Sequence, residues 1–222
     1  MLLVALSLLL FQTPQDLSGT KHSDPIPPEI TASVAAKIAP GGVRAAVGAN
    51  TLTFWWVKEL AASAEASAFA PATADKSAPR TPRAWSDVAE GTLVGAVKIE
   101  KDLRDIRGRV IKAGAYTLRY GIQPANGDHL GVSPFREFLL LSPAGQDTDP
   151  APRGHDALTD LSKQTIGGSH PAVWSLDPPV ATEAALTVRA NTELELKALI
   201  MEVPIAGGTL RFGLVLIGKI EA

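Results

Sequence analysis

The sequence predicts an all-β fold: a mostly antiparallel β-sandwich of roughly eight or nine strands with one short helix. Three observations favour this class. Short runs of strand-forming residues alternate with turns that contain glycine and proline. Only residues 156–166 carry apolar side chains at helical spacing, and Gly167 and Gly168 end that segment. Strands and helices do not alternate along the chain, so a parallel α/β sheet is not expected.

The chain opens with an apolar run at residues 2–11 that only Ser7 interrupts, and its first charged side chain is Asp16. The run is too short to span a bilayer and is typical of a secretory signal. We therefore expect residues 1–15 to be a signal peptide and the mature protein to be periplasmic or extracellular, with no membrane span. A buried N-terminal strand is the alternative, because no Lys or Arg precedes the run. The chain has no cysteine, so an exported form would have to rely on its core alone.

Residues 16–28 are polar and contain Pro25, Pro27 and Pro28, which predicts a disordered tether. The folded domain would then span residues 29–222. Its first elements are predicted as strand-like runs at residues 30–38 and 42–60. Residues 61–83 are rich in alanine, serine and proline without clear periodicity, which predicts a surface excursion. Further strands are predicted at residues 92–99, 109–110, 116–122, 136–141, 172–176, 184–189, 193–202 and 209–217.

The strand at residues 116–122 is the most informative of these. Side chains alternate along a strand, so Tyr116, Leu118 and Tyr120 should share a core face while Arg119 lies on the other. The segment Gly114-Ala-Tyr116-Thr-Leu118 resembles the tyrosine corner of immunoglobulin-like sandwiches, in which a tyrosine hydroxyl bonds to upstream backbone. Together with residues 135–143 it is similar to uncharacterised exported bacterial sandwich proteins. This resemblance implies the fold and implies no activity.

Charge gives no reason to expect a nucleic-acid partner, since the formal net charge is -2 and no Lys/Arg run is present. Arginines are dense around the central strands, but acidic residues lie between them. This mixture favours cross-strand ion pairs on a solvated face, with an anion site as the alternative. The arginines are Arg104, Arg107, Arg109, Arg119 and Arg136.

Two groups of residues are candidates for a binding site. The first combines imidazoles and carboxylates in predicted loops, which could hold a divalent metal if the loops converge. Its members are Asp128, His129, Asp147, Asp149, His155 and His170. Their spacing matches no established ligand motif, and local hydrogen bonding in turns or helix capping explains the aspartates equally well.

The second candidate is Trp55, in the run Phe54-Trp55-Trp56. Adjacent strand residues point to opposite faces, so the two tryptophans cannot enter one core. If Trp55 is exposed it could stack on a sugar or anchor a protein. The alternative is that residues 61–83 cover it.

No nucleophile elbow, phosphate loop, dinucleotide fingerprint or zinc helix occurs in the chain. The sequence therefore favours an exported noncatalytic binding or assembly module without a cofactor, whose partner is another exported protein or a glycan. A metal-binding protein, with or without hydrolytic activity, and a carbohydrate-binding accessory domain are the alternatives.

Overall fold

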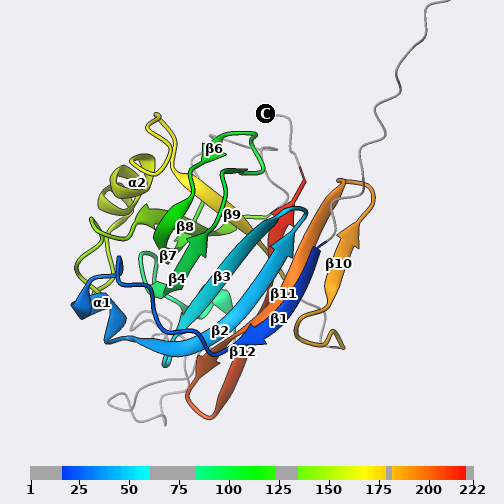
Figure 1. The fold of residues 1–222 in the computed structure, drawn as a ribbon, viewed down its shortest axis with the longest axis horizontal. Coiled ribbons are helices and arrows are strands. Elements are labelled where there is room, and N and C mark those ends of the chain that lie inside the picture. The colour runs from blue at the N-terminus through cyan, green and yellow to red at the C-terminus, as the bar shows by residue number, and fades with distance from the viewer. Residues whose placement is uncertain (1–16, 61–83, 124–134, 179–181, 219–222) are drawn as a thin grey trace, which may run out of the picture.

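The computed structural model describes residues 17–60, 84–123, 135–178 and 182–218, and within them the secondary structure is mostly antiparallel β-strand (Figure 1). The all-β class is thus confirmed. The first strands are β1 (Leu17–His22), β2 (Ile38–Val47), β3 (Asn50–Val57), β4 (Leu93–Ile99), β5 (Leu103–Arg104) and β6 (Val110–Ile111). The later strands are β7 (Gly114–Ile122), β8 (Glu137–Pro143), β9 (Ala172–Asp177), β10 (Val188–Asn191), β11 (Leu196–Ile205) and β12 (Gly208–Ile217). The helices are α1 (Ala32–Ala35), the 3-10 turn η2 (Trp85–Asp87) and α2 (His155–Lys163).

The strands do not form the two separate sheets of the expected sandwich. Ten of them make one sheet in the order β1-β2-β3-β4-β7-β8-β9-β12-β11-β10, and β5 and β6 form a hairpin of their own. The sheet turns from its first half into its second at β9. This strand pairs with β8 through residues 172–175 and with β12 through Leu176 and Asp177. A single strand therefore belongs to both halves of the sheet.

The two halves face each other across one core. The rings of Trp56 on β3 and Phe212 on β12 meet edge to face, with centroids 5.5 Å apart. Phe54 stacks on Trp56, and Trp174 on β9 lies against Phe54. At the open side β1 runs beside β11 (Figure 1), and a Cβ atom on Gly19 would come within 2.9 Å of the Leu199 side chain. The sheet thus nearly closes on itself around aromatic and aliphatic side chains.

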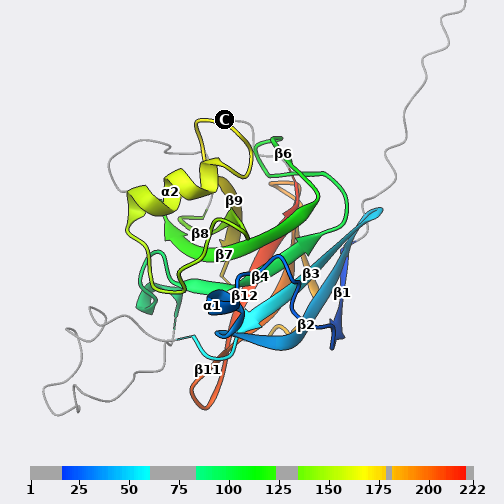
Figure 2. The ribbon, with the colours of Figure 1, turned by 60° about the vertical axis from the view of Figure 1, so that its left-hand side comes forward.

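The helix α2 covers part of the outer face of this sheet (Figure 2). Its Leu158 is fully buried against Phe138, Leu140 and Val173, which project outward from β8 and β9. The predicted helix at residues 156–166 is therefore confirmed, although its N-cap is Gly154 and Asp156 lies in the first turn.

The tyrosine corner expected at the start of β7 is present. Tyr116 is 6% exposed, and its hydroxyl donates a hydrogen bond of 2.8 Å to the carbonyl oxygen of Lys112. Leu118 and Tyr120 share the core face with it, as the alternation predicted. The expected solvated face is wrong for this strand, because Thr117 and Arg119 on the other side are also fully buried.

The N-terminal boundary is a second correction. Residues 17–22 are not part of a tether but form β1, which pairs with β2 from Leu17 opposite Val47 to His22 opposite Gly42. Residues 32–35 form α1 where a strand was expected. The predicted signal peptide at residues 1–15 and the predicted excursion at residues 61–83 lie outside the described residues. No helix in the described part of the chain is long and apolar enough to cross a membrane.

Candidate functional site

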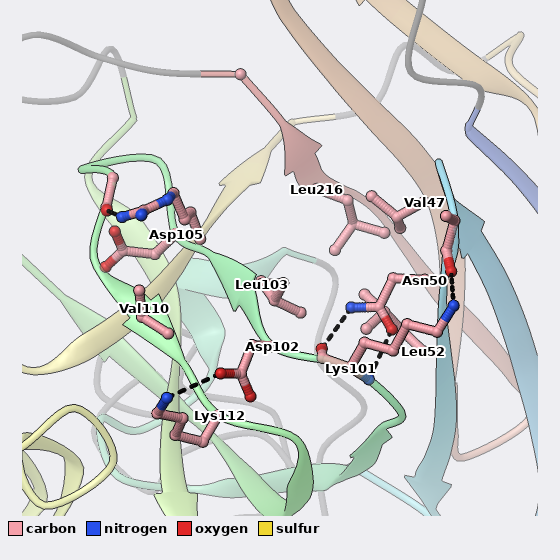
Figure 3. Close-up of a pocket in the computed structure, with 14 residues that line it drawn as sticks. Val47, Asn50, Leu52, Lys101, Asp102, Leu103, Asp105, Val110, Lys112 and Leu216 are labelled. Atoms are coloured by element: carbon pink, nitrogen blue, oxygen red, sulfur yellow. Dashed lines mark hydrogen bonds and ion pairs between the residues drawn. The ribbon is translucent and has the colours of Figure 1, made fainter.

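A cavity of about 670 Å³ opens at one end of the sheet, and we call it the hairpin cavity (Figure 3). Three segments that are far apart in the sequence form its walls: the β2–β3 turn, the β5–β6 hairpin and the end of β12. Its apolar lining consists chiefly of Val47, Leu52, Leu103, Val110 and Leu216. All five residues lie on strands of the sheet or of the hairpin, so strand pairing fixes the position of the cavity floor.

Charged side chains surround this apolar floor. Lys112 donates a hydrogen bond of 2.8 Å to Asp102, and that bond, with one from the Ala113 amide, lowers the pKa of the Asp102 carboxyl. The ammonium group of Lys101 donates to the carbonyl of Ala49 at 2.8 Å.

Arg104 completes the rim, and its guanidinium donates to the carbonyl of Gly108 at 2.6 Å. Neither Lys101 nor Arg104 forms an ion pair with a carboxylate of the described residues. The rim therefore carries two cations that have no carboxylate partner within the described part of the chain.

The hairpin that forms one wall has a rigid turn. Gly108 has a positive φ of 75°, a conformation that glycine adopts readily. The buried Asp105 carboxylate accepts the amide N–H groups of Arg107 and Arg109, at 3.0 and 2.9 Å, and the Arg109 guanidinium, at 2.8 Å. Arg109 also donates to the carbonyl of Pro171 at 2.8 Å, which fastens the turn to the segment before β9.

A second cavity, of about 330 Å³, lies beside α2, and we call it the helix cavity. Its polar lining includes Glu90, Arg107, His155, Lys163 and His170. Glu90 accepts a hydrogen bond from the Ile122 amide at 3.2 Å and lies 2.9 Å from Nδ1 of His155. Its apolar wall is formed by Phe138, Leu140 and Val173, which face outward from β8 and β9, and Ile122 at the end of β7 also lines it.

The structure does not bring the six predicted metal ligands to one point. His155 and His170 both line the helix cavity, but Asp147 is buried beside Arg119, and Asp149 accepts the Ala151 amide at 2.9 Å in a local turn. Asp128 and His129 lie outside the described residues. Across residues 17–60, 84–123, 135–178 and 182–218, no three His, Cys, Asp or Glu side chains are placed to hold a metal ion.

Asp147 instead belongs to a buried ion-pair centre that the sequence did not reveal. Its side chain and that of Arg119 are both 0% exposed, and Arg119 donates to it through Nε at 2.6 Å and Nη2 at 2.9 Å. Thr117 and Arg153 donate two further hydrogen bonds. Burial raises the pKa of Asp147. The opposite effect is larger, because hydrogen bonds from Arg119 and Thr117 and the charges of Arg119 and Arg153 lower the pKa, and the net shift is downward. Asp147 thus stabilises the fold as a carboxylate.

The prediction that Trp55 is an exposed binding residue is also wrong. It is 3% exposed, and its indole N–H donates to the carbonyl of Asp24 at 3.0 Å. The His22 ring meets it edge to face at 5.2 Å. The segment after β1 therefore covers Trp55, and this covering segment is the one that the sequence had assigned to a tether. The other three tryptophans are buried as well, which leaves no stacking surface for a sugar on these rings.

Comparison with known proteins adds no assignment, because no protein-family model, curated protein or solved structure matches the chain.

Proposed function

We propose that this chain is an exported noncatalytic binding module and that the hairpin cavity is its ligand site. The proposed ligand is a small amphipathic molecule with an apolar body and an anionic head. The observation that carries the proposal is the combination of an apolar floor with two rim cations, Lys101 and Arg104, that no described carboxylate neutralises.

The size of the cavity supports this proposal. Pockets for small ligands usually measure about 300–1,000 Å³ and combine apolar walls with a few polar groups. The hairpin cavity falls in that range at about 670 Å³. An alkyl chain could contact Leu52, Leu103 and Leu216 while its head group remains near the cations at the rim.

The state of the carboxylates favours binding over catalysis at this site. A general acid or base works best when its pKa lies near the operating pH. The pKa of Asp102 is instead lowered by Lys112, and Asp105 is held by two amides and the Arg109 guanidinium. Both groups therefore have a structural role in the wall of the cavity.

Calorimetric titration with dodecanoate tests the proposal, because this probe has both an alkyl chain and a carboxylate. We expect saturable binding at one site that weakens about fivefold when Lys101 and Arg104 are both replaced by alanine, since two exposed ion pairs of about 0.5 kcal/mol each contribute about 1 kcal/mol together. Leu103→Gln should also weaken binding, because it removes apolar contact.

Lys58→Ala is the matched control. Lys58 is exposed, and its ammonium group also donates to a backbone carbonyl, that of Ala36, but it lines neither cavity. Absence of binding, or equal weakening in the control, would contradict the proposal. Export is tested separately by N-terminal sequencing of the protein recovered from the periplasm of a bacterial host, where cleavage near residue 15 is expected.

A further inference from the structure

We propose that the helix cavity is a second and separate binding site, which takes a small organic carboxylate with a compact apolar body. It differs from the proposed site in the hairpin cavity in its lining, its volume and its position on the outer face of the sheet.

Arg107 is the central residue of this site. It lines the helix cavity, and its Nε atom is buried without a hydrogen-bond partner among the described residues. A buried donor is rarely left unpaired in a folded protein, so such a group points to a missing acceptor. An arginine guanidinium is also suited to binding a carboxylate with two parallel hydrogen bonds.

Asp105 is the carboxylate whose charge acts on Arg107, and it is already engaged. It accepts the Arg107 backbone amide together with the amide and guanidinium of Arg109. Burial and the adjacent positive charge of Arg109 lower the pKa of Arg107 by more than the negative charge of Asp105 raises it. A bound carboxylate would accept a hydrogen bond from Nε and would raise the pKa of Arg107.

The remaining charges of the cavity also favour an anion. Glu90 is the only acidic residue among the described residues that line it, and it is occupied by the Ile122 amide and His155. Lys163 lines the cavity from the last turn of α2 and pairs with Asp160, which does not line it. The lining therefore holds more cationic than anionic side chains.

The apolar wall defines the rest of the ligand. Phe138, Leu140 and Val173 form one side of the cavity, and Leu158 of α2 packs behind them. A volume of about 330 Å³ is near the lower end of the usual range for ligand pockets, so a single ring suits it better than a long chain. Benzoate has the chemistry that this combination would recognise.

The test compares benzoate with two probes that each lack one feature: benzamide has the ring without the charge, and inorganic phosphate has charge without the ring. Binding is followed by two-dimensional NMR on the full-length chain. We expect benzoate to shift the Nε–H resonance of Arg107 and the amides around residues 121–123 and 169–173. Benzamide and phosphate should bind at least about tenfold more weakly, because a hydrogen bond to a charged group corresponds to a factor of that order.

Two variants locate the site. Arg107→Gln should weaken benzoate binding about tenfold or more. The affinity of Arg107→Lys for benzoate should lie between those of Arg107→Gln and the native protein. Arg104→Gln is the matched control, since Arg104 belongs to the same hairpin but lines the other cavity. It should leave benzoate binding unchanged and weaken dodecanoate binding.

Equal affinity for benzoate and benzamide, shifts confined to the hairpin cavity, or unchanged binding in a folded Arg107→Gln protein would each overturn this proposal. Because the two cavities are read out with different probes and variants, failure at one site leaves the result at the other intact.

Discussion

Replacing Asp147 with asparagine should destabilise the protein strongly. The change keeps the size of the side chain but removes the charge that neutralises Arg119, and both side chains are 0% exposed. Removing one partner of a buried ion pair typically costs about 3–5 kcal/mol, because the remaining charge stays buried without compensation. The two hydrogen bonds from Arg119, at 2.6 and 2.9 Å, show that the pair is close and well aligned. We therefore expect a loss of this size in the free energy of unfolding at neutral pH.

The pH dependence gives this prediction a second, independent readout. The folded-state pKa of Asp147 is lowered, so its contribution is fully present above the unfolded value of about 3.9 and is lost as the pH falls through the folded pKa. Asparagine does not titrate. The difference between the native protein and the variant should therefore be largest at neutral pH and should shrink in acid.

Urea denaturation at neutral and acidic pH measures both effects. Asp160→Asn is the control, because the Asp160 side chain is 72% exposed and its pairing with Lys163 should contribute less than about 1 kcal/mol. A loss below about 1 kcal/mol for Asp147→Asn, or a loss that does not change with pH, would refute the account of the buried pair.

Three further predictions concern the fold and the metal hypothesis. Tyr116→Phe should cost about 1 kcal/mol in chemical denaturation, because only the hydrogen bond to Lys112 is lost; unchanged stability would remove the tyrosine corner as a stabilising contact. A chain that starts at Asp24 lacks β1 and should melt well below one that starts at Asp16, whereas equal melting temperatures would show that β1 is dispensable. Zinc, manganese or calcium should not raise the melting temperature relative to a chelated sample; a rise that disappears in His170→Ala would support a metal site.

Local pattern was enough to predict much of the sheet. The alternation around Leu118 and Tyr120 and the glycines after α2 depend on neighbours within a few positions, which a single sequence displays directly. The hydroxyl of Tyr116 bonds to a residue four positions earlier, so the tyrosine corner also lies within reach of sequence reasoning.

Contacts between distant segments could not be predicted in the same way. Most residues of β1 are half-buried or exposed, so this strand is recognisable only through its pairing with β2. Arg119 and Asp147 are 28 positions apart, and nothing in their local sequences indicates that they meet. The burial of Trp55 depends on Asp24, 31 positions earlier.

The two cavities were missed for the same reason. The hairpin cavity joins residues from the β2–β3 turn, the β5–β6 hairpin and the end of β12, and the helix cavity joins residues from 90 to 173. The density of arginines was visible in the sequence, but the partners of each were not. Arg119 is neutralised by a distant aspartate, whereas Arg104 has no described carboxylate partner.

NMR titration of the native protein with dodecanoate reports where the ligand lies as well as whether it binds. We expect saturable shifts clustered at residues 47–52, 101–112 and 216–218, with α2 and the tryptophans of β3 and β9 unaffected. Shifts spread over the whole surface, shifts centred on another face, or no saturable shifts would contradict the assignment of the hairpin cavity as the ligand site.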